Sequence, residues 1–212
     1  MVIALAVMVS LDLTDAFDRA VIGAVQAPEL HGLLTPLRFI TELGSTWAVT
    51  VMAAITFFVA AAIGPWRHGL IGAITIGLAS LGNTLFKTFV ARERPDLLEP
   101  VLVEHGFSFP SGHSALGMVA YGVLAVLVSR SRLPQHVRRG AIVALLVLVG
   151  LIGLSRVWLG VHYPTDVIAG WAAGGVIVLI YAALSRSVSL EPAEGAADED
   201  PAAPRSGRPA ME

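Results

Sequence analysis

The stretch SGHSALGMVAYGVLAVLVS, residues 111–129, decides the fold because it contains no Asp, Glu, Lys or Arg. Its length is close to the roughly 20 mostly apolar residues that a helix needs to cross the hydrocarbon core of a bilayer. In lipid each backbone N–H and C=O must be bonded within its own segment, so we expect a helix and not a strand. Four further stretches share this character, at residues 47–64, 69–86, 141–155 and 167–185.

These stretches predict an all-α integral membrane bundle with five clear spanning helices. The last of them contains Gly170 and Gly174, whose spacing of four residues suits close packing against another helix. Of the 212 residues 55% are hydrophobic and only 14% are charged, whereas a soluble domain has about 25% charged residues. The net charge of −2 offers no basic surface for nucleic acid, and the chain has no Cys for disulfides or thiolate zinc sites. We therefore expect a bilayer, and not a nucleic acid, as the partner.

The two ends of the chain differ from the membrane part, residues 47–185. Residues 1–11 are apolar but too short to span a bilayer. Two interpretations stay open, a short interfacial anchor or the end of a first membrane helix that begins upstream, and we favour the second. Residues 12–44 carry enough charge to form an amphipathic surface or in-plane segment, so residues 1–46 form an outer-face unit. Residues 186–212 combine charges with Pro, Ala and Gly, which predicts a disordered tail.

The basic residues between the apolar stretches predict the orientation of the bundle. Residues 129–140 hold four arginines and no acid, Arg67 lies in the loop 65–68, and Arg186 follows the last stretch. Short loops rich in Lys and Arg stay on the cytoplasmic side. We therefore expect the C-terminal tail in the cytoplasm and the opposite helix ends on the extracytoplasmic side.

Ionisable residues gather at these opposite helix ends. They are Lys87, Arg92, Arg94, His113, Arg156, His162 and Asp166. Such groups at membrane depth are costly and usually functional, and Lys and Arg together suit the oxygens of a phosphate. In Pro110-Ser111-Gly112-His113, Ser111 is a plausible N-cap, Gly112 lets the backbone approach a ligand closely, and the free N–H groups of the helix start form a phosphate seat.

The second histidine lies in the segment His162-Tyr163-Pro164-Thr165-Asp166. Pro164 suits the first position of a helix, which places Asp166 in the first turn and within reach of one imidazole nitrogen. A carboxylate that holds the Nδ1–H leaves the Nε2 lone pair free to act as a nucleophile or base. His113, on another helix, could serve as a general acid.

Three motifs carry a resemblance to a known family. They are Lys87-(six residues)-Arg94-Pro95, Pro110-Ser111-Gly112-His113 and Ser155-Arg156-(five residues)-His162-(three residues)-Asp166. In this order and spacing they resemble the three-part signature of the type 2 phosphatidic acid phosphatase family. This membrane family shares its site with the vanadium-dependent haloperoxidases, so the resemblance implies that helical core. Bacterial members commonly have six spanning helices, whereas the first one here is only the stub 1–11.

The resemblance also implies roles for individual residues. His162 attacks phosphorus and becomes a phosphohistidine, Asp166 orients it, and His113 protonates the leaving oxygen and then activates water. The residues that would hold the phosphate oxygens are Lys87, Arg94, Ser111, Gly112 and Arg156. No metal and no cofactor are implied. Arg92 lies outside the motif and is left out of the predicted site.

The resulting hypothesis is a membrane phosphatase that dephosphorylates a lipid phosphate or diphosphate at the outer leaflet. Phosphatidic acid, phosphatidylglycerol phosphate and a polyprenyl diphosphate all fit, because the motifs grip only the phosphoryl group. A lipid phosphotransferase that uses the same phosphohistidine is the alternative. A small transporter is disfavoured, since its ionisable residues would lie near the bilayer midplane and on both sides of it.

Overall fold

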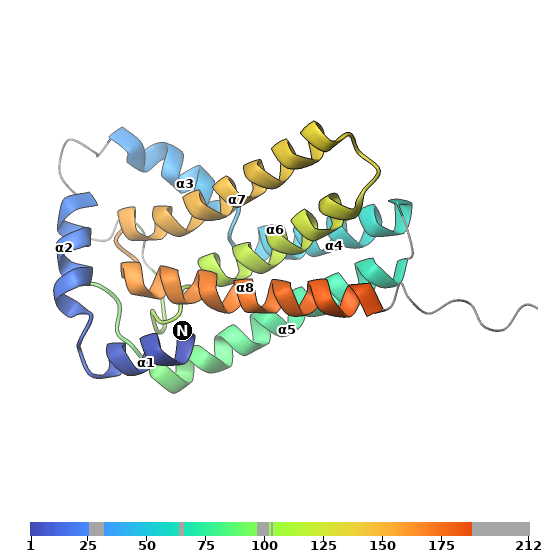
Figure 1. The fold of residues 1–212 in the computed structure, drawn as a ribbon. Coiled ribbons are helices and arrows are strands. Elements are labelled where there is room, and N and C mark those ends of the chain that lie inside the picture. The colour runs from blue at the N-terminus through green and yellow to red at the C-terminus, as the bar shows by residue number, and fades with distance from the viewer. Residues whose placement is uncertain (26–31, 64–65, 97–101, 103, 188–212) are drawn as a thin grey trace, which may run out of the picture.

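Eight helices make up the part of the chain that the computed structural model describes, residues 1–25, 32–63, 66–96, 102 and 104–187 (Figure 1). Three are short: α1 (Val2–Ser10), α2 (Asp15–Val25) and α3 (Leu34–Glu42). Five are long: α4 (Thr46–Ile63), α5 (Trp66–Val90), α6 (Gly112–Arg130), α7 (Gln135–Trp158) and α8 (Pro164–Ser187). The described residues contain no strand, so the all-α prediction is confirmed.

The long helices coincide with the five predicted spans. By length and composition α5, α6, α7 and α8 can each cross a membrane, and α3 and α4 qualify together as a pair bent by 48°. The described residues thus provide up to five spans when the bent pair is taken as one, and the chain is a multi-pass membrane protein. The predicted surface segment therefore contains a helix, α3, that continues into a membrane helix.

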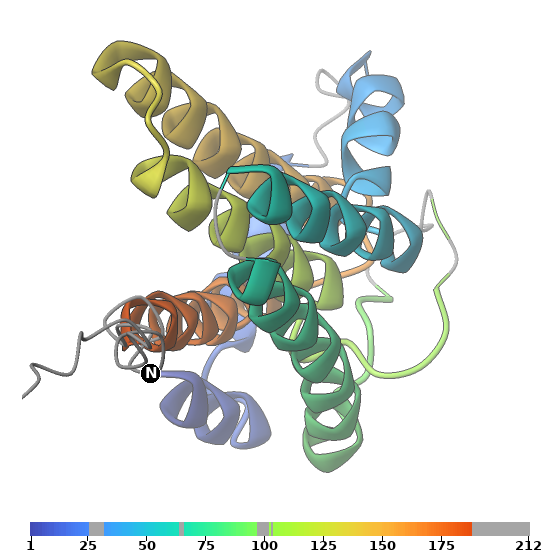
Figure 2. The ribbon, with the colours of Figure 1, turned by 90° about the vertical axis from the view of Figure 1, so that its right-hand side faces the viewer.

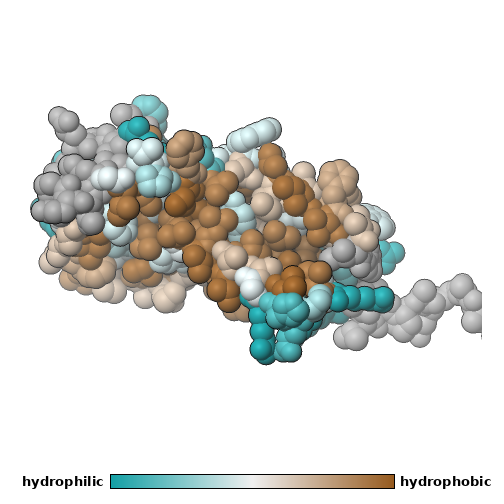
Figure 3. All heavy atoms as spheres, turned by 90° about the horizontal axis from the view of Figure 1, so that it is seen from above, coloured by the Kyte–Doolittle hydropathy of each residue, from teal (hydrophilic) through white to brown (hydrophobic). Residues whose placement is uncertain are grey.

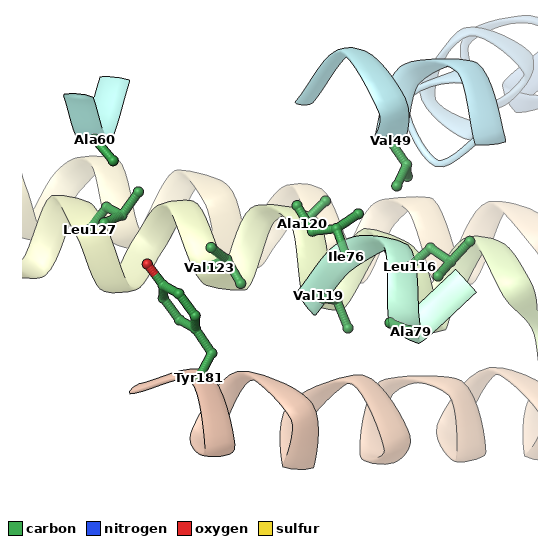
Figure 4. Close-up of a cluster of buried hydrophobic side chains, with 10 residues drawn as sticks. All are labelled: Val49, Ala60, Ile76, Ala79, Leu116, Val119, Ala120, Val123, Leu127 and Tyr181. Carbon is green, nitrogen blue, oxygen red and sulfur yellow. The ribbon is translucent and has the colours of Figure 1, made fainter. Parts of the chain in front are cut away.

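Helix α6 lies at the centre of the bundle and packs against α4, α5, α7 and α8 (Figure 2). Its side chains Val119 and Val123 are fully buried, which a membrane helix achieves only when neighbours surround it. Figure 4 shows this core, in which residues from α4, α5 and α8 face α6. The Tyr181 ring of α8 closes one end, where its hydroxyl donates to the His68 carbonyl (3.3 Å).

Two glycines of α8 set how closely it approaches α6. A Cβ atom at Gly170 would lie 2.7 Å from the Ser111 carbonyl oxygen, and one at Gly174 would lie 2.6 Å from that of Ala115. The predicted packing role of this glycine pair is confirmed. Because of the close approach the two helices begin side by side, and the Ser111 N–H donates to the Asp166 carbonyl (3.0 Å).

Large apolar side chains such as Phe58, Leu78 and Leu179 are exposed along the bundle. Figure 3 shows hydrophobic side chains over the middle of the face that it views and hydrophilic ones toward the ends. An exposed apolar belt of this kind is what lipid covers.

The two ends of the bundle differ in the charged side chains that they carry. At one end Arg130, which ends α6, donates to the Ser185 hydroxyl and to the Ala182 carbonyl of α8 (2.7 Å each). Helix α8 extends through Ser187, so it includes Arg186, the first residue of the predicted tail. The rest of that tail, residues 188–212, lies outside the described residues.

Candidate active site

All eight predicted site residues lie at the other end of the bundle, where α5 and α7 end and α6 and α8 begin (Figure 1). Lys87 is in the last turn of α5 and Arg156 in the last turn of α7. His113 is in the first turn of α6 and Asp166 in the first turn of α8. Arg94 and His162 lie on the loops between these helices. Four helix ends therefore build one site.

The imidazole of His162 is buried and held from both sides. Its Nδ1 lies 3.3 Å from Asp166 Oδ2, which also accepts the Tyr163 N–H (2.9 Å). Its Nε2 lies 3.3 Å from Arg94 Nη1. A guanidinium can only donate, so Nε2 must present its lone pair and the ring proton must sit on Nδ1 toward Asp166. This is the tautomer that the sequence predicts for a nucleophile.

The surroundings of His162 keep this imidazole neutral. Burial lowers the pKa of His162 well below its usual value of 6.5, and the nearby Arg156, Lys87, Arg94 and His113 lower it further. A neutral imidazole has a lone pair at physiological pH, which a nucleophile requires. The groups that lower this pKa include His113 and three of the predicted cations.

Arg94 and Arg156 form the cationic part of the site. The carboxylate of Glu104 bridges them, with an ion pair to Arg94 Nη2 (3.2 Å) and another to Arg156 Nη2. Arg156 is almost fully buried, its Nη1 donates to the Thr41 hydroxyl (2.6 Å), and its Nε has no partner among the described residues. An arginine pair that already holds one anionic group, with a buried donor to spare, is suited to a phosphate.

The start of α6 supplies backbone donors beside these cations. The Ser111 hydroxyl caps the helix, since it accepts from the Ser114 N–H (3.4 Å). The predicted N-cap is confirmed, and the amides of Gly112 and His113 follow it as the first helical donors. A Cβ at Gly112 would lie 3.2 Å from Asn83 Nδ2 and 3.9 Å from Lys87 Cε, so glycine allows α5 to approach.

Lys87 and His113 complete the set. Lys87 Nζ donates to the Phe107 carbonyl (2.8 Å), which ties the end of α5 to the loop before α6. His113 is half-buried and packs at the break between α3 and α4, where a Cβ at Gly44 would lie 3.1 Å from His113 Cδ2. The site therefore includes groups from all three predicted motifs.

Arg92, which was left out of the predicted site, directly contacts one of the predicted site residues. Arg92 Nη1 donates to Asp166 Oδ1 (2.6 Å), on the oxygen opposite the one that faces His162. Thr41 and Glu104, which contact Arg156, were also missed. Arg92 could have been suspected from the sequence. Charged residues are few in this chain, so a third cation close to Lys87 and Arg94 is unusual.

The described residues contain no group of three or more His, Asp or Glu side chains that could hold a metal ion. The absence of a metal and of a cofactor from the reaction stays a prediction.

Comparison with known proteins identifies a family and several relatives of this chain. A sequence profile described as the PAP2 superfamily matches residues 68–188. Phosphatidylglycerophosphatase B of Bacillus subtilis is 33% identical over 166 residues, 76% of this chain and 77% of that protein. Decaprenylphosphoryl-5-phosphoribose phosphatase of Mycolicibacterium smegmatis is 34% identical over 160 residues, 72% of this chain and 81% of that protein.

The fold has a close counterpart among solved structures. The crystal structure of a transmembrane PAP2-type phosphatidylglycerolphosphate phosphatase from Bacillus subtilis matches with a TM-score of 0.78 at 28% sequence identity. The match covers 88% of this chain and 93% of that one, so it extends well beyond the residues that the sequence profile matches.

Proposed function

Because the chain belongs to the PAP2 superfamily and is a membrane phosphatase, we propose that it hydrolyses a lipid phosphate or lipid diphosphate through a phosphohistidine on His162. One observation carries the proposal. The Nε2 lone pair of a neutral, buried His162 faces Arg94, while the other ring nitrogen is held by Asp166. A nucleophile is thereby oriented toward the cations that would bind its phosphoryl group.

The proposed reaction has two steps. In the first, His162 Nε2 attacks phosphorus, the bond from phosphorus to the leaving oxygen breaks, and His113 gives its proton to that oxygen. The lipid alcohol or lipid phosphate leaves, and His162 carries the phosphoryl group. In the second, neutral His113 takes a proton from water, the oxygen of that water attacks phosphorus, and the bond from phosphorus to His162 Nε2 breaks, which releases inorganic phosphate. Both histidines then regain their initial protonation.

The cations and the helix start supply the electrostatic part of catalysis. Phosphoryl transfer places negative charge on the three equatorial oxygens, and preorganised donors that face this charge lower the barrier. We assign this role to Arg94, Arg156, Lys87 and the amides of Gly112 and His113. The Ser111 hydroxyl acts mainly by capping α6 and so fixing these amides, because it is buried and bonded to Ser114.

A cavity of about 680 Å³ beside the site supports a lipid substrate. Its lining comes from α1, α5, α6 and α8, and among the described residues of that lining Thr75 and Asn83 are the only ones with polar side chains. It reaches Pro110, the residue before Ser111, and Asn83, one turn before Lys87. A lipid chain in this cavity would have its phosphate at the start of α6.

We also propose that the site faces the extracytoplasmic side and that the tail is cytoplasmic. The support is the cluster of basic loops at the opposite end of the bundle, where Arg130 and Arg186 lie. The substrate would then come from the outer leaflet.

The experiment measures phosphate release in detergent from phosphatidylglycerol phosphate, phosphatidic acid and undecaprenyl diphosphate, with EDTA present. We expect release from at least one of them, a labelled phosphoenzyme from a radioactive substrate, and loss of both in His162→Ala. His136→Ala, at an exposed histidine near the start of α7, is the matched control. Dependence on added Mg²⁺, or full turnover by His162→Ala, would overturn the mechanism. Formation of a new lipid phosphate from an added lipid alcohol, without phosphate release, would favour the phosphotransferase.

A further inference from the structure

Arg92 lies behind the catalytic carboxylate and connects it to the N-terminal part of the chain. Its Nη1 donates to Asp166 Oδ1 (2.6 Å) and to the Thr165 hydroxyl (2.9 Å). Its Nη2 donates to Asp18 Oδ2 (2.8 Å), and its guanidinium carbon lies 3.9 Å from the centre of the Tyr163 ring. One side chain thus contacts α2 and the start of α8 together.

Asp18, in the first turn of α2, acts on the same helix start. Its Oδ1 accepts the Thr165 N–H (3.1 Å) and its Oδ2 accepts the Thr165 hydroxyl (2.7 Å). A carboxylate at a helix N-terminus binds donors that the helix leaves unpaired and interacts favourably with the helix dipole. Asp18 therefore caps α8 although it lies far from that helix in the sequence.

The charges of Arg92, Asp18 and Asp166 depend on one another. Asp18 and Asp166 are both fully buried, and Arg92 is their shared cation. Buried carboxylates are stable only when they are paired and hydrogen-bonded. Burial alone would lower the pKa of Arg92, but Asp166 and Asp18 outweigh it and raise that pKa, so the guanidinium stays charged. A planar fork can serve two carboxylates at once, which an ammonium group does less well.

The two oxygens of Asp166 have different partners as a result. Oδ1 is occupied by Arg92, and Oδ2 faces His162 Nδ1 and the Tyr163 N–H. We propose that Arg92 and Asp18 are positioning residues that act through Asp166 to fix the orientation of the nucleophile His162. This inference rests on the proposed function, because it assigns a task in the attack of His162 on phosphorus.

We expect Arg92 to affect the chemical step and not the binding of substrate. The described contacts of Arg92 are to Asp18, Asp166 and their neighbours, and they include none of Lys87, Arg94 or Arg156. Loss of Arg92 should therefore lower kcat and leave KM within about twofold. Residues that orient a metal-binding side chain through a hydrogen bond contribute about 10- to 100-fold, and we expect a decrease of similar size in Arg92→Met.

A double-mutant cycle tests whether Arg92 acts through Asp166. The variants are Arg92→Met, Asp166→Asn and the two together, assayed on a substrate that the wild type hydrolyses. We expect Arg92→Met to cost about 10- to 100-fold in kcat in the wild type and less than about threefold when Asp166 is already Asn. Arg19→Met is the matched control, because Arg19 is exposed on α2 and, among the described residues, its ion pair is with Asp15 of the same helix at 3.7 Å. It should retain wild-type kcat.

Each outcome decides the inference. An equal loss in both backgrounds means a purely structural role and overturns it, as does wild-type kcat in Arg92→Met or a change in KM without a change in kcat. If Arg92→Met does not give a monodisperse protein, Asp18→Asn replaces it in the cycle, since the amide keeps the shape and can still accept from Thr165. A wild type without activity on any lipid phosphate contradicts the proposed function, whereas an active wild type with additive variants contradicts only this inference.

Discussion

At the scale of single residues, the state of His162 makes a prediction about stability and pH. The folded chain disfavours protonation of His162, whose pKa burial and four neighbouring groups lower well below 6.5. The unfolded chain binds this proton as the pH falls below about 6.5. The stability contributed by the neutral imidazole is therefore complete above that pH and is lost as the pH falls toward the lowered pKa, by up to about 1.4 kcal/mol per pH unit.

Thermal unfolding in detergent measures this effect. Between about pH 7.5 and about pH 5.5, which spans the ordinary histidine pKa of about 6.5, the Tm of the wild type should fall further than that of His162→Asn. The exposed His136→Asn should follow the wild type. Parallel Tm curves for wild type and His162→Asn would show that His162 is not held neutral by the fold.

Glu104 makes a second prediction at this scale. A phosphate that binds the Nη2 atoms of Arg94 and Arg156 competes with the Glu104 carboxylate that bridges them. Glu104→Gln removes the competing charge, so inorganic phosphate should inhibit this variant more strongly than the wild type. A charge-assisted hydrogen bond contributes about 1.5–3 kcal/mol, which corresponds to an inhibition constant lower by about 10- to 150-fold. The control is Glu93→Gln in the same loop, which is exposed. Unchanged or weaker inhibition would show that Glu104 does not compete with phosphate.

Site residues that belong to a sequence motif could be predicted from the sequence. Residues that reach the site only through contacts between distant helices could not. His162 and Asp166 are four residues apart at a helix start, so their contact follows from local geometry. Thr41 reaches Arg156 only because α3 packs against α7, and nothing local to Thr41 indicates that packing. Arg92 is a similar case, since its main partners lie on α2 and α8.

At the scale of helices, the contact between α6 and α8 makes the third prediction. A valine at Gly174 would press against the backbone oxygen of Ala115, which cannot move without displacing α6. Overpacking typically costs about 1–3 kcal/mol, so we expect Gly174→Val to lower the Tm by about 5 °C. It should also lower kcat, because it separates Ser111 from Asp166. Gly175→Val, at a position with open space around it, should change neither quantity. Equal effects in the two variants would mean that the close approach does not position the site.

The helices that lipid covers were predictable, and the short ones were not. A long apolar run has few alternatives to a spanning helix in a bilayer, so α5 to α8 follow from composition. Helices α2 and α3 are amphipathic, and their polar positions do not reveal which face is buried. The structure shows that Asp18 and Thr41 are buried against the site, so α2 and α3 are part of its framework and more than surface helices.

At the scale of the whole molecule, the separation of the two ends makes the last prediction. The site lies at one end, and the basic residues that favour the cytoplasm lie at the other. Because the chain has no Cys, a single introduced cysteine reports its own side of the membrane. Glu93→Cys, beside the site, should react in intact cells with a thiol reagent that cannot cross the membrane. Arg132→Cys, in the loop between α6 and α7, should react only after the cells are opened; both positions are exposed. The reverse pattern would place the site in the cytoplasm and require an inner-leaflet substrate, while the chemistry at His162 would stand.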